Sequence, residues 1–201
     1  MTAELLAGPL LSLALGYLLG SIPFGIVLTR VAGAGDLRRI GSGNIGATNV
    51  LRTGRKGLAA LTLLLDGLKG AAAVLLVGAL SPGHETLAAI SALFGHLYPV
   101  WLRFRGGKGV ATLFGIMAAL HWPSSLVYAA IWVGSLGLLR YSSVAGMLAA
   151  LSAPVAAAVL GRFDLALLYL GLGLLVIWQH RGNIERLLAG TEPRVGAKAD
   201  A

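Results

Sequence analysis

The chain has 201 residues, of which 57% are hydrophobic and only 12% are charged, and its mean hydropathy is +0.82. A soluble domain of this length has too little interior to bury so much apolar surface, so the bilayer is expected to act as its solvent. The net charge is +8, and the cations stand between apolar runs, which favours membrane orientation and anionic ligands over nucleic acid. Because the chain has no cysteine, disulfides, thiol nucleophiles and cysteine-ligated metals are excluded.

Seven apolar runs are predicted to cross the membrane, where a helix needs about 20 residues to span the hydrocarbon layer. The fourth and fifth runs are expected to be short, tilted or partly re-entrant. Pro23, with glycines on both sides, is expected to kink the first helix and free backbone groups there. The predicted spans are residues 5–29, 58–80, 86–102, 110–120, 125–139, 143–160 and 165–179.

The cations divide unevenly between the two sets of loops. Fourteen of the 16 Lys and Arg residues lie in one set of alternate loops or in the C-terminal segment, and the opposite set holds only Arg162. By the positive-inside rule this places the C-terminus in the cytoplasm and the N-terminus outside. The remaining cation, Lys69, stands three residues after Asp66 in the second span, where a structural ion pair is expected. The prediction is a single all-α integral membrane domain over residues 1–201, with a loose tail from about residue 191.

The first polar motif, residues 41–52, combines three glycines with hydroxyl and amide side chains and one arginine. Free backbone N–H groups, such donors and a planar cation are the parts of an anion-binding nest. The alternative is a flexible loop, in which turns favour glycine and asparagine and the cations only follow the positive-inside rule. That alternative does not account for the clustering of donors, so a phosphate site is favoured. The candidates are Gly41, Ser42, Gly43, Asn44, Thr48, Asn49 and Arg52.

The second motif, residues 95–112, runs into the start of a predicted helix. The N-terminus of a helix carries free N–H groups and partial positive charge, which stabilise an anion, and Lys108 adds a full charge there. The pattern of a P-loop is absent, because a glycine follows the lysine. His96 is an ionisable group at membrane depth and so a functional candidate, although a structural hydrogen bond is the commoner role of such a histidine. The candidates are His96, Gly106, Gly107, Lys108, Gly109 and Thr112.

The third motif begins where the last predicted span ends. His180, Asn183 and Arg186 recur at three-residue spacing, so they share one face of a continuing helix. The alternative is an amphipathic helix lying on anionic lipid, and for Arg186 that reading is preferred. His180 and Asn183 are assigned to function, and Glu185 is included as a substrate-binding candidate.

Together the three motifs resemble those of the bacterial integral-membrane acyl-phosphate:glycerol-3-phosphate acyltransferases, the PlsY family. The first motif of that family, GSGNxGxTNxxR, is complete in residues 41–52, and the third, HxxNIxRLxxGxE, is complete in residues 180–192. The second, GHxxxxFxxFxGGKxVAT, matches residues 95–112 with Trp101 in place of the usual phenylalanine. The resemblance covers the whole chain, including the order of the spans.

The resemblance implies transfer of a fatty acyl group from acyl phosphate to the 1-hydroxyl of sn-glycerol 3-phosphate, giving lysophosphatidic acid and phosphate. The active site would lie at the cytoplasmic face of the bacterial cell membrane. An acyl phosphate is already an activated anhydride, so no metal or other cofactor is expected and the protein supplies positioning and charge stabilisation. The implied partners are the two substrates, membrane lipid and the enzyme that produces the acyl phosphate, with no nucleic acid.

Roles for the polar residues follow as hypotheses. Lys108 and the amides of residues 106–109 would hold the phosphate of the acyl donor. Arg52, suited to bidentate contact, and Ser42 would bind phosphate, and the resemblance places both among the critical residues. Ser42 as a covalent nucleophile is less favoured, because the donor is already activated.

The group that takes the proton from the glycerol hydroxyl stays open between three candidates. His180, which with Asn183 would orient glycerol 3-phosphate, is a candidate base by its ordinary pKa. His96 is the rival, and a substrate phosphate is the third.

Two other classes of function compete with the enzyme: a transporter or channel for an anionic solute, and a lipid-binding scaffold without chemistry. A transporter is disfavoured because the polar motifs lie at one face of the membrane and no inverted repeat is visible.

Overall fold

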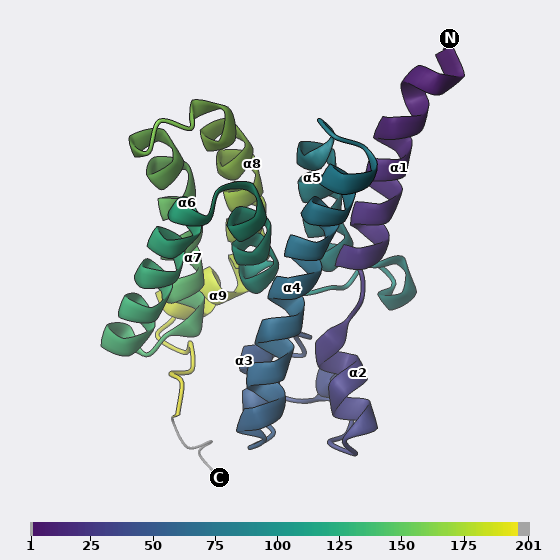
Figure 1. Ribbon diagram of the computed structural model, residues 1–201. Coiled ribbons are helices and arrows are strands. Elements are labelled where there is room, and N and C mark those ends of the chain that lie inside the picture. Colours follow the sequence, from purple (N-terminus) through teal and green to yellow (C-terminus); the bar gives the residue numbers. More distant parts are fainter. Residues whose placement is uncertain (1, 197–201) are drawn as a thin grey trace. The chain divides into compact units, whose positions relative to one another are not determined.

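The structure is a computed structural model that describes residues 2–196, and every regular element in that range is a helix (Figure 1). The chain divides into two compact units, the first ending at Trp122 and the second beginning at Pro123. Each unit is described by itself below.

The first unit contains two long helices, several short ones and the beginning of a sixth α-helix. Its elements are α1 (Thr2–Gly20), α2 (Phe24–Val31), the 3-10 helix η1 (Leu37–Arg39), α3 (Ala47–Leu51), α4 (Lys56–Leu80), α5 (Glu85–Leu97), the 3-10 helix η2 (Val100–Leu102) and the first part of α6 (Val110–Leu139). The second unit holds the rest of α6, then α7 (Ser142–Val159), α8 (Phe163–Gln179) and α9 (Arg181–Leu188).

Within the described residues, four helical segments are long and apolar enough to cross a membrane. A fifth results if α8 and α9, which are bent by 56° at His180, form one broken span. The predicted third span ends early, because α5 stops at Leu97 and the chain continues as η2. The predicted fourth and fifth spans lie in one element, α6, whose backbone leaves the helical region at His121 (φ −159°, ψ 88°) just before Pro123. The count of seven spans stays a prediction.

Small residues allow the helices of the first unit to pack closely. Gly16 and Gly20 on α1 lie against the backbone of Ala88 and Ala92 on α5, and a side chain at either glycine would collide with it. Gly67 and Gly70 on α4, with Gly115 on α6, make a second close contact, in which Thr112 and Gly67 supply the facing carbonyls. This packing of backbone on backbone is typical of membrane helices.

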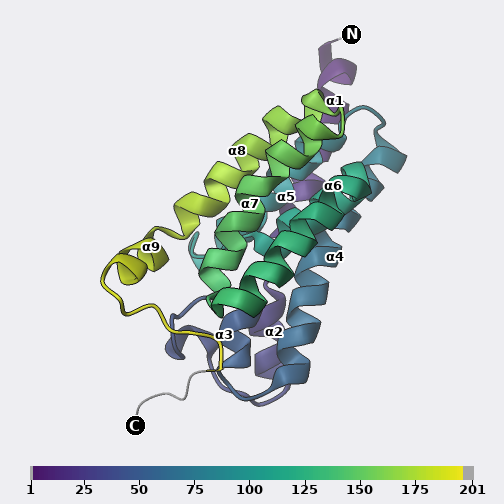
Figure 2. The same ribbon diagram turned by 90° about the vertical axis from the view of Figure 1, so that its left-hand side faces the viewer.

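The second unit is built on an alanine-rich contact between α7 and α8, which lie side by side in Figure 2. Gly173 on α8 faces the backbone of Ala150 on α7. The buried alanines of α7 are Ala145, Ala149, Ala150, Ala153, Ala156 and Ala157.

The kink predicted at Pro23 is present as a break between α1 and α2, visible in Figure 1. The predicted ion pair also forms, with Lys69 Nζ 2.7 Å from Asp66 Oδ1 and both side chains buried. A buried charge in an apolar interior requires such a partner.

Candidate functional site

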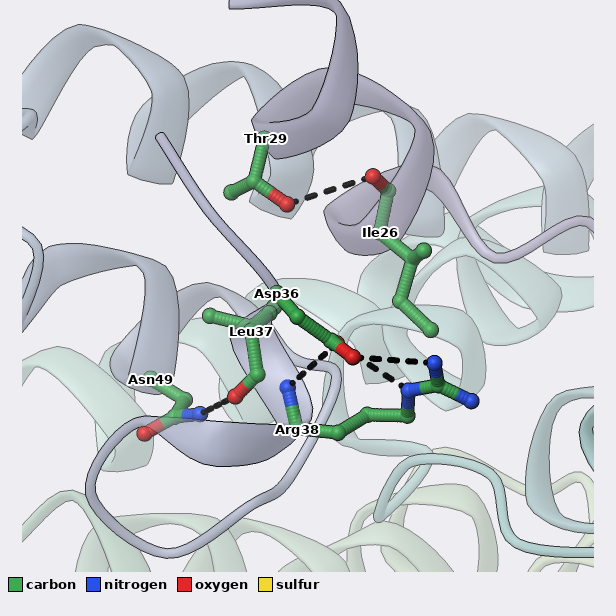
Figure 3. A network of polar contacts seen from close by, with 6 residues as sticks. All are labelled: Ile26, Thr29, Asp36, Leu37, Arg38 and Asn49. Carbon is green, nitrogen blue, oxygen red and sulfur yellow. Dashed lines mark hydrogen bonds and ion pairs between the residues drawn. The ribbon is translucent and has the colours of Figure 1, made fainter. Parts of the chain in front are cut away.

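The first motif forms a loop between η1 and α4, and the amide of Asn49 organises it. Asn49 Nδ2 donates to the carbonyl oxygens of Leu37 at 2.9 Å, Ile40 at 2.9 Å and Asn44 at 2.8 Å. Figure 3 shows the bond to Leu37 beneath the Thr29 end of α2. Asn49 is buried, and its donors are taken up by the loop itself. The amide of Asn49 thus holds the loop together, and the contact with substrate expected from the sequence stays a prediction.

Arg52 lies at the end of the same loop, next to its first residue. Gly41 has a left-handed backbone (φ +52°), and a Cβ there would stand 2.7 Å from Arg52 Nη1. Asn49 Oδ1 accepts a long hydrogen bond, 3.5 Å, from the same nitrogen. Arg52 and Ser42 are both exposed. The loop thus presents one guanidinium and one hydroxyl on a backbone fixed from within.

The other loop candidates divide into shaping and exposed positions. Asn44 Oδ1 accepts from the N–H of Gly46 at 3.0 Å, so this side chain supports the turn. Gly43 has a left-handed backbone (φ +68°) and packs on the carbonyl of Arg38. Thr48 is exposed on α3.

The second motif folds back on the end of α5. Gly106 N–H donates to Leu97 O and Gly107 N–H to His96 O, each at 3.0 Å. A side chain at Gly107 would collide with the His96 imidazole, and one at Gly106 with the backbone of the same turn. These two amides, assigned to a phosphate from the sequence, are occupied by the carbonyl oxygens that end α5. Their glycines are needed for close approach to the helix.

Lys108 and Gly109 lead from this contact into α6. Lys108 is half-buried. Gly109 has a left-handed backbone (φ +83°), and its carbonyl oxygen accepts a hydrogen bond from the N–H of Leu113 at 2.8 Å. Lys108 therefore stands directly before the first turn of a helix, as predicted. Thr112 is fully buried where α6 contacts Gly70, so the structure places it in helix packing.

His96 belongs to a buried polar cluster. Its Nδ1 lies 3.8 Å from Asp66 Oδ1, the oxygen that pairs with Lys69. The other nitrogen, Nε2, is the atom nearest to the place where a Gly107 side chain would be. The structure thus brings His96 together with the glycine pair of the second motif.

The third motif lies in the second unit, where α8 ends and α9 begins. His180 is buried, and its Nδ1 lies 2.7 Å from the carbonyl oxygen of Val176. A carbonyl only accepts, so Nδ1 carries the proton and Nε2 is the ring nitrogen able to accept one. Asn183 follows one turn later, and its N–H donates to His180 O at 2.8 Å. The candidate Glu185 is exposed on α9.

Glu192, which was not among the residues expected from the sequence to bind substrate, contacts two side chains of the third motif. Its Oε1 accepts from Ser143 Oγ and from Asn183 Nδ2, each at 2.6 Å, and its Oε2 accepts from Arg186 Nε at 2.8 Å. Burial alone would raise the pKa of this carboxyl, but the three hydrogen bonds outweigh it and the pKa is lowered. A loose tail was predicted from about residue 191. In the described part of that segment, Glu192 makes these three bonds and the N–H of Val195 donates to Arg140 O at 2.7 Å, whereas residues 197–201 lie outside the described part.

Arg186 was expected from the sequence to face anionic lipid. Its Nε donates to Glu192 Oε2, so it forms an ion pair within the protein. The only signal in the sequence for this contact is the final position of the third motif, at Glu192. Nothing local points to Ser143, which is distant in the chain.

Comparison with known proteins agrees with these motifs. A family model described as glycerol-3-phosphate acyltransferase matches residues 10–190. The glycerol-3-phosphate acyltransferase of Novosphingobium aromaticivorans is 64% identical over 189 residues, which cover 94% of this chain and 96% of the relative. That of Mesorhizobium japonicum is 56% identical over 191 residues, covering 95% of this chain and 98% of the relative.

Two solved structures of PlsY, an integral membrane glycerol 3-phosphate acyltransferase, are similar in fold. The glycerol 3-phosphate form has a TM-score of 0.88 and 38% identity, and the match covers 94% of this chain and 96% of that one. The lysophosphatidic acid form has a TM-score of 0.85 and 37% identity, covering 92% of this chain and 94% of the other. The chain therefore belongs to the glycerol-3-phosphate acyltransferase family and is an integral membrane protein.

Proposed function

We propose that the protein transfers a fatty acyl group from acyl phosphate to the 1-hydroxyl of sn-glycerol 3-phosphate. The hydroxyl oxygen attacks the acyl carbonyl carbon, the bond from that carbon to the phosphate oxygen breaks, and an ester forms. The products are lysophosphatidic acid and inorganic phosphate. The forms of the PlsY relative named for glycerol 3-phosphate and for lysophosphatidic acid support these two ligands.

The observation that carries the proposal is the placement of Arg52 and Lys108. Each cation is carried by a segment whose backbone is fixed by hydrogen bonds. The Asn49 amide fixes the loop that carries Arg52, and the carbonyl oxygens at the end of α5 fix the segment that leads to Lys108. Two phosphorylated substrates need two such cations. Fixed charges of this kind stabilise a leaving phosphate without reorganisation during the reaction.

The amides of Gly106 and Gly107, expected from the sequence to bind phosphate, donate to carbonyl oxygens of α5, so we give these two residues another role. Lys108 and the first turn of α6 hold the phosphate of the acyl donor, while Gly106 and Gly107 act by supporting Lys108. Arg52 and Ser42 bind phosphate, with Gly41, Gly43, Asn44 and Thr48 shaping or lining that loop.

His180 and Asn183 orient glycerol 3-phosphate, with Glu185 beside them on α9. Three candidates remain for proton removal: Nε2 of His180, the imidazole of His96, and a substrate phosphate. The tautomer of His180 supports its Nε2 as the acceptor within that residue.

The same proposal includes a membrane arrangement. The chain acts as one domain with seven crossings, an outer N-terminus and a cytoplasmic C-terminus, and each of the three motifs lies on the cytoplasmic side of the bacterial cell membrane. The break in α6 at His121 supports counting that element as two spans, and the distribution of cations supports the sidedness. There the acyl phosphate arrives through lipid or from the enzyme that makes it.

The test is phosphate release from acyl phosphate that requires glycerol 3-phosphate, measured on protein purified in detergent. Arg52→Ala and Lys108→Ala should abolish turnover while the variants remain monodisperse. Arg39→Ala removes an exposed arginine near the same loop and should leave turnover unchanged. Near-normal turnover in both site variants would place the chemistry elsewhere. A solute flux in liposomes without acyl transfer would favour a transporter, and lipid binding without turnover would favour a scaffold.

A further inference from the structure

The first span is interrupted at a point where two backbone carbonyls accept hydrogen bonds from side chains of other elements. α1 ends at Gly20 and α2 begins at Phe24. Pro23 has no N–H to donate, so the helical pattern cannot continue through the break. A carbonyl left without a donor at membrane depth costs free energy. Ile22 O accepts the N–H of Phe24 at 3.1 Å within the break, and both Ser21 O and Ile22 O accept a further bond from another element.

Two side chains from other elements supply the donors. Trp101 Nε1, on η2, donates to Ser21 O at 2.7 Å. Lys69 Nζ, on α4, donates to Ile22 O at 2.7 Å, and its charge is balanced by Asp66. The Lys69 side chain is only 2% exposed, so this charge-assisted bond is shielded from water. The break is therefore held from two sides.

On one side the break leads to the first motif. Gly25, in the first turn of α2, lies directly against the carbonyl oxygen of Ile45, and a side chain there would collide with it. Leu37, whose carbonyl Asn49 binds, packs at the same point. Because Gly25 has no side chain between α2 and Ile45 O, a shift in the start of α2 would displace the loop that carries Ser42.

On the other side the same residues lead to the second motif. Asp66 Oδ1 faces both Lys69 and the His96 imidazole, and that imidazole packs on Gly107, the residue before Lys108. Trp101 stands in the segment that joins His96 to Gly106. Lys69 and Trp101 thus connect the break to both cation-bearing motifs of the first unit.

We propose that Lys69 and Trp101 are positioning residues for acyl transfer: by holding the α1–α2 break in one geometry, they fix the first motif relative to Lys108. This inference rests on the function proposed above. A misplacement of about 1 Å between reacting groups can cost roughly 100-fold in rate, so the two bonds matter far from the substrates.

Two variants remove these bonds, and the second also removes the Asp66 carboxylate that faces His96 and the Lys69 ammonium that lies over the Phe24 ring. Trp101→Phe keeps an aromatic ring and deletes only the indole N–H and the second ring. The double variant Asp66→Asn with Lys69→Met deletes the bond to Ile22 without leaving a buried charge unpaired. The matched controls are Trp178→Phe and Lys56→Met, which alter an exposed tryptophan and an exposed lysine.

The measurement is kcat and KM for glycerol 3-phosphate, per mole of monodisperse enzyme. We expect Trp101→Phe to raise KM or lower kcat at least about threefold. The double variant should change one of these constants at least about tenfold in the same direction, and both controls should keep the wild-type values. Loss of folded protein alone lowers the yield but changes neither constant.

If both constants stay at the wild-type value in Trp101→Phe and in the double variant, the positioning role is overturned. If the double variant does not fold, Trp101→Phe decides alone. Absence of acyl transfer in the wild-type protein would instead refute the proposed function, so the two failures are distinguishable.

Discussion

Ser143 and Asn183 donate hydrogen bonds to one and the same oxygen, Oε1 of Glu192, each at 2.6 Å. Ser143 lies in the first turn of α7, Asn183 lies on α9, and Glu192 follows α9, so a single carboxylate joins three parts of the second unit. Arg186 occupies the other oxygen. The Asn183 amide proposed to face substrate is therefore oriented by Glu192.

Replacing this carboxylate should destabilise the second unit. Glu192→Gln puts an amide NH2 toward groups that donate, so at least one of the three bonds is lost and a donor is left unsatisfied, at a cost of about 1–3 kcal/mol. The expected result is a lower thermal unfolding midpoint in detergent. Glu185→Gln, on the exposed side of α9, should leave the midpoint unchanged. Equal midpoints for Glu192→Gln and wild type would contradict a structural role for Glu192.

The same residue predicts a dependence of stability on pH. The pKa of Glu192 is lowered in the folded protein by its three hydrogen bonds, which outweigh burial. A lowered pKa means that its stabilisation is fully present above the unfolded carboxyl value, about 4.3, and is lost as pH falls through the folded value. The difference in midpoint between wild type and Glu192→Gln should therefore be constant near neutral pH and shrink below about pH 4. A difference that grows on acidification would give the opposite sign.

Gly107→Ala should impair the second motif. The added methyl group would occupy the position of the His96 ring, and overpacking of this kind costs about 1–3 kcal/mol. We expect turnover to fall at least tenfold as Lys108 is displaced. Gly57→Ala adds the same methyl in the first turn of α4, where nothing lies within 4 Å, and should be tolerated. Wild-type turnover in Gly107→Ala would show that the ring moves aside freely.

Asn49→Asp should loosen the first motif without changing its size. The aspartate cannot donate, so three carbonyl oxygens lose their shared partner. Limited trypsin digestion after Arg38 and Arg39, both exposed, should become at least tenfold faster. Asn44→Asp is the matched control, because that side chain accepts a hydrogen bond from the N–H of Gly46 and an aspartate can accept the same bond. Unchanged cleavage in Asn49→Asp would refute the organising role of its amide.

Several local features could be predicted from the sequence because one or two residues determine them. Pro23 interrupts a helix wherever it stands, since it lacks an N–H. Asp66 and Lys69 face each other at one-turn spacing, and neither charge is stable alone in an apolar interior. The kink at His121, two residues before Pro123, follows from the same chemistry, although the residues on both sides belong to one element, α6.

The partners of the motif residues could not be predicted in the same way. A glycine in a motif indicates that another group lies close to the backbone. That group can be a substrate phosphate or the carbonyl of a helix, because both accept a hydrogen bond from an N–H group. At Gly106 and Gly107 the carbonyl oxygens of α5 take that place. Glu192 was missed because its partner Ser143 is far away in sequence, and a polar C-terminal segment alone reads as a tail.

The closure of α5 by the two glycine amides means that this part of the protein is already ordered before any ligand arrives. Chain that is fixed in advance loses little conformational entropy on binding, so more of the attraction proposed between Lys108 and a phosphate would appear as affinity. A loop that had to fold around its ligand would lose part of that gain. The glycines of the second motif thus make this turn rigid, although glycine is the most flexible residue in an unfolded chain.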